Sequence, residues 1–490
     1  MRAVKKKPGR RTTAPTLSAR LNDRVTLQIE ADGRIAAEVD GYPVELGKFD
    51  AAAAKRAAAL RAGLPIASAS SAGSPVNQEI AALVRRLARR GLLEYRLAAA
   101  RGEKDIVVIE PQVADYWPQR AKLNNTDTVV LSRFAYLRRR GADMVLESSR
   151  AGALFRICDP QIASFLAELS KPQKIATLRR QRGFPGIELF GLLLDCEILL
   201  KVDGKNGDGL RPSEGDANLV LWDFHDLLFH TRSTEGRQAN PLGGIYPYAD
   251  MMAPLPAERP RWPGRTIDLV RFGAVSAPSQ PGSGLAKLLR ERHSIRDFDE
   301  THPITLAELA QFLDGTARVL SRWESPIDFE GDAPVIAYTG RPYPSAGSAH
   351  ELELYLAVNN CEGLPRGFYH YDAGGHALVP IEVAAHQLNA MLTAAQFATD
   401  APGLPQILIT IAARFGRVSW KYSSIAYSLV LKNVGGLVQT FYLMATDMGL
   451  GGCALGTNNI ELFANMTGLK FHVEGPVGQF ALGRGVKTEA

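Results

Sequence analysis

The sequence predicts an α+β protein with several domains, and three observations support this fold class. The chain has 490 residues, more than one ordinary hydrophobic core accommodates, so about two to four domains are expected. Hydrophobic residues make up 46% of the chain and charged residues 22%, which is ordinary for a folded globular protein. Strand and helix patterns follow one another without regular alternation, which favours α+β over a doubly wound parallel sheet.

Residues 1–20 are predicted to be a disordered basic arm. They hold seven lysines and arginines and no acid, and they lack the apolar run of a secretory signal. Because the formal charge of the whole chain is +6, the remainder is nearly neutral, which is weak support for a nucleic-acid surface.

Cysteine usage and hydropathy bear on the compartment. The four cysteines are far apart and form no C-x-x-C pair, so neither a disulfide framework nor a metal site is expected. No stretch qualifies as a membrane span, because the most apolar one contains Lys432, Asn433 and Gln439. A cytoplasmic protein is therefore expected.

Residues 21–102 and 103–205 are predicted to be two winged-helix-like modules, each with strands, two helices and a closing strand. In the first, these are a hairpin around Asp32-Gly33, helical stretches at Ala51–Ala62 and Pro75–Arg90, and the strand LLEYRL. In the second, they are the strands of TVVLSRFAYLRRRGADMVLESS, helices at Asp159–Ser170 and Pro172–Arg180, and the closing stretch Leu192–Val202.

Winged-helix modules often bind DNA, and the arginines within 138–140 and 179–182 suggest that possibility. Basic residues on small helices usually form only a solvated face. Since the body of the chain is nearly neutral, docking of a peptide or protein ranks above DNA, and no nucleic-acid partner is expected.

Residues 206–283 are predicted to be a linker and the first part of the last domain. The segment 218–237 has an apolar face, and His225 and His230, five residues apart, are a poor metal pair on a helix. Core or capping roles are expected for both histidines. The proline-rich connector 241–281 is expected to be extended.

Residues 284–490 are predicted to be a compact α+β domain. Helices are expected at Gly284–Arg292, at Leu306–Gly315 with Thr305 as N-cap, at Ile381–Thr393, and through the apolar run Ile425–Ala445. Strands are expected at Leu352–Val358, Phe368–Tyr371, Ala377–Ile381, Gln406–Ala413 and Gln479–Leu482, with a hairpin turn at 373–375.

Several motifs of this last domain suggest a binding site. In RERHSIRDF (290–298), two arginines and a serine alternate, and such forks suit a phosphate. PSAG (344–347) is a tight turn able to approach a planar ring. Lys421-Tyr422 precedes the long apolar helix, and a glycine-bearing turn, Gly451–Thr457, follows it. Taken singly, each motif is better explained without a binding site, as solvated arginines, an ordinary turn or a core helix that ends at glycine.

In this order, however, the motifs resemble the FMN-dependent nitroreductase superfamily. They are RERHSIRDF, PSAG followed by ELELYLAVN, GFYHYD, KY with its helix, MGLGGCALGT and ALGRG. Within it, they are most similar to SagB/McbC-type azoline dehydrogenases of thiazole/oxazole-modified microcin biosynthesis. The similarity covers roughly residues 216–490. The preceding part resembles, more loosely, the tandem winged-helix, peptide-recognition-like domains of cyanobactin azoline oxidases.

The resemblance implies a set of site residues and no metal. FMN phosphate and ribityl contacts would come from Arg292, His293, Ser294 and Arg296, with Arg484 closing on the phosphate. The isoalloxazine would be lined by Pro344, Ser345, Ala346 and Gly347, and by a glycine-turn wall of Ala454, Leu455, Gly456 and Thr457. The Lys-Tyr pair used in catalysis corresponds to Lys421 and Tyr422.

The implied reaction removes two hydrogens from a thiazoline or oxazoline of a ribosomally made precursor peptide, and O2 reoxidises the flavin. Tyr422 or Lys421 would be the base. A homodimer is implied, because flavin sites of the superfamily are built at a dimer interface, and a cyclodehydratase complex is the expected partner. The alternatives are a generic NAD(P)H-dependent nitro or quinone reductase, a non-catalytic scaffold of a cyclodehydratase complex, and a DNA-binding regulator.

Two stretches depart from the family pattern. Relatives often continue PSAG with Gly-Leu-Tyr-Pro, whereas this chain has 348–351 as SAHE. The central helix often reads Gly-His-x-x-Gln-Asn, whereas 435–440 here is GGLVQT. A polar contact near the flavin is therefore expected to be missing.

Overall fold

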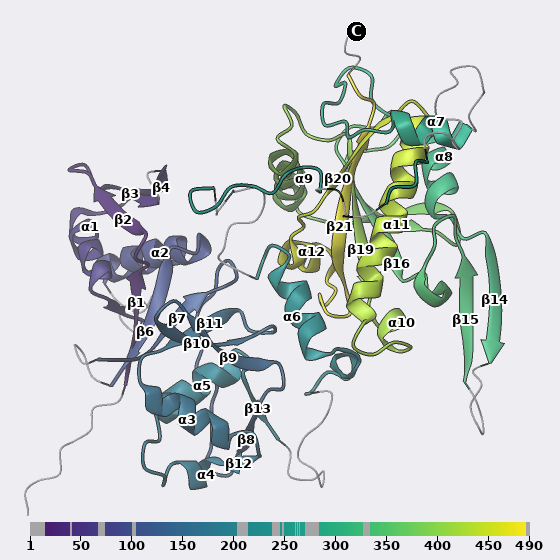
Figure 1. The fold of residues 1–490 in the computed structure, drawn as a ribbon. Helices are drawn as coiled ribbons and strands as arrows, with labels where there is room; N and C mark the ends of the chain where they lie inside the picture. The colour runs from purple at the N-terminus through teal and green to yellow at the C-terminus, as the bar shows by residue number, and fades with distance from the viewer. Residues whose placement is uncertain are drawn as a thin grey trace, which may run out of the picture. The chain divides into compact units, whose positions relative to one another are not determined.

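A computed structural model gives the fold (Figure 1). It describes residues 15–39, 42–66, 74–99, 104–202, 214–237, 246, 249–259, 261, 263, 265–269, 284–326 and 334–486. The chain has two compact units, Met1–Arg232 with Gly236–Ala239, and Ser233–Glu235 with Asn240–Ala490. Both mix helices and sheets, so the predicted α+β class is confirmed. No helix of the described ranges is long and apolar enough to cross a bilayer.

The N-terminal unit is rich in sheet. Its strands are β1 Thr16–Leu21, β2 Val25–Ile29, β3 Arg34–Val39, β4 Tyr42–Lys48, β5 Leu64–Pro65, β6 Leu93–Ala98, β7 Asp105–Pro111, β8 Thr128–Leu131, β9 Ala135–Arg140, β10 Asp143–Ser148, β11 Ala153–Ile157, β12 Gln173–Lys174 and β13 Leu199–Lys201. Its helices are α1 Ala51–Ala57, α2 Pro75–Arg89, α3 Pro160–Glu168, α4 Ile175–Leu178, α5 Ile187–Asp195 and α6 Phe224–Arg232, with 3-10 turns η1 Ala58–Arg61 and η3 Ala217–Leu221.

One antiparallel sheet runs through most of this unit, in the order β5-β1-β6-β7-β11-β10-β9. Strands from both modules expected at 21–102 and 103–205 lie in this sheet, and their apolar side chains share one core. The division into two modules stays a prediction. β1 begins at Thr16, so the end of the arm expected at 1–20 lies in the sheet, and residues 1–14 are outside the described ranges.

Two of the three arginines of β9, Arg138 and Arg140, are paired with carboxylates. Arg138 pairs with Glu147 at 2.6 Å, and Arg140 makes two hydrogen bonds to the Glu110 carboxylate, at 2.8 and 2.6 Å. These contacts place carboxylates beside the side chains that suggested a nucleic-acid surface.

Other expectations for this unit are confirmed or amended. The hairpin at Asp32-Gly33 joins β2 and β3, and the expected helix from Pro75 is α2. Helix α5 was not expected, because an apolar run does not distinguish helix from strand. His230 is fully buried and stacks on Trp222, so its core role is confirmed. The connector 241–281 lies largely outside the described ranges.

The C-terminal unit is built on a six-stranded antiparallel sheet in the order β18-β17-β16-β19-β21-β20. Its strands are β14 Ser321–Pro326, β15 Val335–Gly340, β16 Leu352–Val358, β17 Gly367–Asp372, β18 Ala377–Ile381, β19 Ile407–Arg414, β20 Gly451–Leu455 and β21 Glu474–Gly483. Its helices are α7 Gly284–Glu291, α8 Leu306–Ala317, α9 Ala385–Thr399, α10 Gly416–Ser419, α11 Ala426–Asp447 and α12 Ile460–Thr467, with the 3-10 turn η6 Ala346–Ser348.

Helices cover both faces of this sheet. α9 and α12 lie on one face, and α7, α8 and α11 on the other (Figure 1). On the second face, Phe441 of α11 packs between Phe312 of α8 and Phe480 of β21, with ring centroids 5.3 Å apart in both pairs. The apolar run 425–445 is thus the core helix that its spacing predicts.

Three local outcomes bear on the site. Thr305 caps α8 in a capping box with Glu308, as its sequence predicts. The expected glycine turn at 451–457 is wrong for its first part, because Gly451–Leu455 is strand β20 paired with β21. The hairpin β14–β15 was not expected; it forms a separate two-stranded sheet.

Candidate functional site

The PSAG turn packs directly on helix α11. The Asn433 Oδ1 atom accepts a hydrogen bond from the Ala346 backbone N–H at 3.0 Å. A Cβ atom on Gly436 would come within 3.2 Å of the Pro344 ring. The glycine at 436 therefore allows the turn to lie close against the helix, at a position where a side chain had been expected from the family pattern.

The buried carboxyl group of Glu351 stabilises the PSAG turn through hydrogen bonds. Glu351 is fully buried and accepts hydrogen bonds from Asn433 Nδ2 at 2.8 Å and from Ser345 Oγ at 3.2 Å. Burial raises the pKa of Glu351, against the opposing effect of the Asn433 hydrogen bond. The Ser345 hydroxyl also accepts the His350 backbone N–H at 2.9 Å. The turn is thus fixed by an internal polar network.

The Lys-Tyr pair lies against the same turn. Lys421 and Tyr422 follow the short helix α10, and both backbone N–H groups donate to the Val418 carbonyl, at 3.0 and 2.9 Å. Gly347 has a φ of +56°, and a Cβ atom there would come within 2.5 Å of the Tyr422 hydroxyl and 2.8 Å of the Lys421 Nζ. Two motifs far apart in the sequence therefore meet at Gly347.

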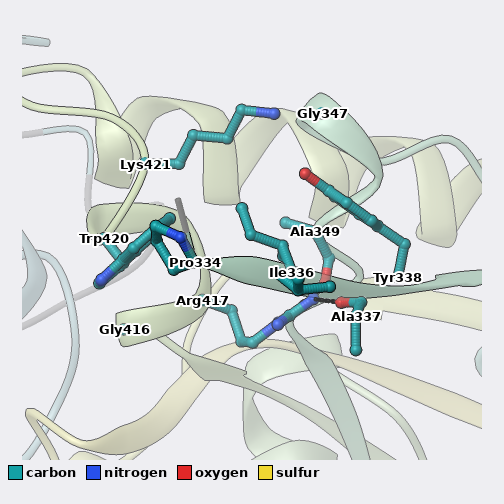
Figure 2. Close-up of a pocket in the computed structure, with 11 residues that line it drawn as sticks. Pro334, Ile336, Ala337, Tyr338, Gly347, Ala349, Gly416, Arg417, Trp420 and Lys421 are labelled. Carbon is teal, nitrogen blue, oxygen red and sulfur yellow. Dashed lines mark hydrogen bonds between the residues drawn. The ribbon is translucent and has the colours of Figure 1, made fainter. Parts of the chain in front are cut away.

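Lys421 reaches over a pocket of about 240 Å³ (Figure 2). Its Nζ lies 5.9 Å from the centre of the Tyr338 ring and 5.5 Å from that of Tyr422, within the range of cation–π contacts. Much of the wall is apolar: Pro334, Val335, Ile336, Ala337 and Trp420. The pocket can accept an apolar group beside two cationic side chains, Lys421 and Arg417, and the phenol of Tyr338.

The arginine motif is brought to the other end of α11. Tyr442 of that helix contacts Ser294, with the two hydroxyl oxygens 2.9 Å apart, and accepts the Ala454 backbone N–H at 2.8 Å. Arg292 lies 4.9 Å above the Tyr442 ring. Ile295 donates its N–H to Gly452 O at 2.9 Å, so the motif runs beside β20.

Arg484 lies at the same end of the site and forms an ion pair with Glu308. It makes hydrogen bonds to both Glu308 carboxylate oxygens, at 2.7 and 2.9 Å. Burial opposes ionisation of Glu308, but the hydrogen bonds from Thr305 and Arg484 outweigh it and hold the pKa of Glu308 below its ordinary value. The predicted phosphate contact of Arg484 stays a prediction.

The predicted residues thus form two groups rather than one. The first group consists of residues 344–347 and Lys421, and it contacts α11 at Asn433. The second consists of residues 292–294 and Ala454, and it contacts α11 at Tyr442. Asn433 and Tyr442 are nine positions apart along the helix, which corresponds to about 14 Å at 1.5 Å per residue. Such a spacing suits an elongated ligand with a phosphate at one end and a flat ring at the other.

Some of the predicted cofactor-binding residues are exposed or lie in the core, away from the contacts described above. His293 and Arg296 are exposed, and His293 Nδ1 lies 2.9 Å from Glu291 O. Leu455 is buried in the core under α9 and α12. Gly456 is exposed, and Thr457 follows it after β20. Their roles in cofactor binding stay predictions.

Asn433, Tyr442 and the contacts of Glu351 were not predicted. Asn433 is a buried polar residue between buried Val430 and Leu437 of α11, and a polar residue on the apolar face of a helix is a readable signal. Tyr442 and Glu351 carry no comparable signal, because their partners are distant in sequence. Asn433 supplies a polar contact in the region where one was expected to be missing.

Comparison with known proteins agrees with this architecture. The family model described as the nitroreductase family matches residues 289–484, and that described as cyanobactin oxidase ThcOx matches residues 129–239. A protein of Methanocaldococcus jannaschii, described as a nitroreductase, is 32% identical over 174 residues, which are 35% of this chain and 78% of the relative. The chain belongs to the nitroreductase family of oxidoreductases. The region that matches the cyanobactin oxidase model precedes the region that matches the nitroreductase model.

Two solved structures are also similar. One is a nitroreductase of Ralstonia eutropha JMP134, with 23% identity, 43% of this chain and 88% of that chain covered, and a TM-score of 0.33. The other is in the Escherichia coli microcin synthetase McbBCD complex with truncated pro-MccB17 bound, with 18% identity, 57% and 98% covered, and a TM-score of 0.38.

Proposed function

We propose that the chain is an FMN-dependent azoline oxidase, which converts thiazolines or oxazolines of a precursor peptide to thiazoles or oxazoles. The observation that carries the proposal is the contact of Gly347 with Lys421 and Tyr422, of which Gly347 and Lys421 line a largely apolar pocket. Membership of the nitroreductase family and the match of 129–239 to a cyanobactin oxidase model support the same class of reaction.

The residues of the two groups fit FMN. Gly347 has no side chain, so the ends of Lys421 and Tyr422 lie directly against the PSAG backbone, and a flat ring bound beside this turn would be next to both groups. At the other end, Arg292 and the Ser294 hydroxyl offer a cation and a donor for a phosphate. When bound, FMN supplies the acceptor for one hydrogen and an electron pair.

The chain's own residues would orient the substrate and take the proton. The apolar walls of the pocket hold the azoline ring and keep water from it. The deprotonated Tyr422 oxygen or the neutral Lys421 Nζ takes the proton from the ring carbon that was the amino acid's Cα and becomes a phenol or an ammonium group. The C–H bond at the β-carbon then breaks with its electron pair, and the new double bond makes the ring aromatic.

The assembly belongs to the same proposal. A homodimer would complete the flavin site, and the cyanobactin-oxidase region would dock the precursor peptide or its cyclodehydratase. A generic NAD(P)H-dependent reductase is the second candidate, because membership of the nitroreductase family alone fits it equally.

Anaerobic mixing of the flavin-loaded protein separates the two candidates. We expect an azoline peptide to bleach the flavin absorbance and the peptide to lose two hydrogens per ring. NADPH or NADH alone should bleach it slowly or not at all. Rapid bleaching by NADPH, with no change in the azoline peptide, would replace the azoline oxidase with the reductase.

A further inference from the structure

A second cavity, of about 490 Å³, adjoins the pocket of Lys421. The two share Ala337, Tyr338, Ala349 and Arg417 in their walls. Unlike the first pocket, the second is strongly cationic. Its charged lining consists of Arg322, Arg341, Arg414 and Arg417 with one acid, Glu324.

These guanidinium groups are held mainly by backbone carbonyls. Arg417 donates to Ala337 O at 3.0 Å and Ala349 O at 3.2 Å, and Arg341 donates to Leu352 O at 3.0 Å. Among the described residues, only Arg414 of the four has a carboxylate within 4.0 Å, that of Glu353 at 3.7 Å. Each guanidinium carries five N–H donors, so capacity for an anion remains.

Arg322, the remaining arginine of the cavity wall, comes from the β14–β15 hairpin. It lies on β14 and donates to Gly374 O at 3.3 Å. Carbonyl partners fix a guanidinium in place without neutralising its charge. Arg322, Arg341 and Arg417 are therefore pre-positioned around the cavity, which lowers the ordering cost of binding an anion.

His350 lines the same cavity with an unsatisfied atom. Its side chain is buried, at 8% exposed, and no hydrogen-bond partner of its Nδ1 lies within the described parts of the chain. The residue has a φ of +41°, in the left-handed region, and its ring packs edge-on against Tyr343 at 5.2 Å. An unpaired polar atom and a strained backbone are both costly, and they concentrate where a ligand binds.

The electrostatics of the cavity agree with this chemistry. Burial and the guanidinium groups of Arg341 and Arg417 lower the pKa of His350 to about 4. The imidazole is therefore neutral at physiological pH, and the positive charge comes from the arginines alone. Glu324 and Glu353 offset part of that charge, so a net positive charge remains for an anion. A peptide carries its negative charge on carboxylates, which guanidinium forks can bind through two parallel hydrogen bonds.

We infer that this cavity binds a carboxylate of the peptide substrate, close to the azoline ring that enters the pocket of Lys421. The carboxylate comes from an Asp or Glu side chain next to the ring or from the C-terminus of the peptide. The inference rests on the proposed function, since it gives the substrate of that site a required acidic group.

Binding of the aromatic product tests the inference without turnover. The probes are fluorescent thiazole peptides carrying Asp, or Asn in its place, next to the ring, each with a free or an amidated C-terminus. Fluorescence anisotropy measures binding of these peptides to the flavin-loaded protein. The peptide that carries the bound carboxylate should have a dissociation constant about tenfold lower than the matching neutral peptide, because the neutral peptide lacks the charge-assisted hydrogen bond. The Asp and C-terminal arms identify which carboxylate it is.

Arginine variants locate the effect. Arg322→Gln and Arg414→Gln should each raise the dissociation constant of the acidic peptide several-fold and leave that of the neutral peptide unchanged. Arg366→Gln is the matched control, because this arginine bonds Asn359 and Asn389 outside the cavity. It should change neither.

The outcomes separate the two proposals. Equal affinity for acidic and neutral peptides, unaltered by the arginine variants, overturns the carboxylate site even if azoline peptides are oxidised. A preference for acidic product without any azoline oxidation keeps the site and removes the proposed function. If the arginine variants instead raise the KM for NADPH and not for NADH, the cavity holds a nucleotide phosphate and the carboxylate assignment is wrong.

Discussion

Gly347 and Lys421 lie so close that a Cβ atom on the glycine would come within 2.8 Å of the lysine Nζ. The contact joins the PSAG turn to the segment between α10 and α11. It exists because Asn433 and Gly436 let the turn settle on α11, and because α10 ends just before Lys421. A position that faces the turn proposed to bind the flavin ring is where a base for an azoline would be needed.

Replacing Gly347 by alanine tests that contact. The new methyl group would push the Lys421 and Tyr422 side chains aside, and both are flexible at their ends. We expect kcat to fall about tenfold or more, as for a misplaced general base. The left-handed φ of +56° should cost about 1 kcal/mol of stability. Azoline turnover and urea unfolding measure the two effects.

Gly468→Ala is the matched control for backbone strain. Gly468 ends α12 with a φ of +72°, and a Cβ atom there meets nothing within 4 Å. The variant should lose similar stability and keep its kcat. If both variants lose activity equally, strain rather than displacement of Lys421 and Tyr422 explains the loss.

Tyr442→Phe tests the phosphate end of the site. The variant removes one hydroxyl that contacts Ser294 and accepts the Ala454 N–H. Loss of these bonds is worth about 1 kcal/mol each, so the dissociation constant of FMN should rise about fivefold or more. Flavin fluorescence during titration of the apoprotein measures it. Tyr369→Phe, which removes a bond to Pro365 O outside both residue groups, should leave FMN affinity unchanged.

Glu351 gives the protein a pH-dependent stability component. Burial raises its pKa in the folded state above the ordinary value of 4.5, so the folded state holds the proton more tightly than the unfolded state. This contribution is fully present below about pH 4.5 and is lost as pH rises through the folded-state pKa. Glu351→Gln removes it, while the amide oxygen can still accept from Asn433.

The free energy of unfolding of the two proteins should therefore diverge with pH. Relative to Glu351→Gln, the wild type should lose stability as the pH is raised from 4.5 toward neutrality. Urea unfolding at a series of pH values measures the difference. A constant difference across the series would mean that Glu351 ionises as readily in the folded as in the unfolded chain.

The elements with strong local signals could be predicted from the sequence. Thr305 with Glu308 predicts the capped start of α8, and the apolar spacing from Ile425 to Ala445 predicts α11. Gly451–Leu455 was expected to be a turn, because two glycines mask a short strand whose partner is β21. The pairing energy of that strand comes from distant residues, which a local pattern does not contain.

The site residues also divide into those with a local sequence signal and those without one. Lys421, Tyr422 and the PSAG turn stand out through their motifs, and the structure brings them together. Asn433, Glu351 and Tyr442 act through contacts with segments far away in sequence, so only the folded chain reveals them. The second cavity likewise draws its arginines from β14, β19, α10 and the PSAG region.

The most direct test of the account is the mass of an azoline peptide after incubation in air with flavin-loaded protein and no NAD(P)H. The wild type should remove two hydrogens per ring. Lys421→Ala and Tyr422→Phe should retain FMN and slow this step about 100-fold for the residue that is the base. Unchanged turnover in both variants, or an unchanged peptide mass with the wild type, would contradict the account.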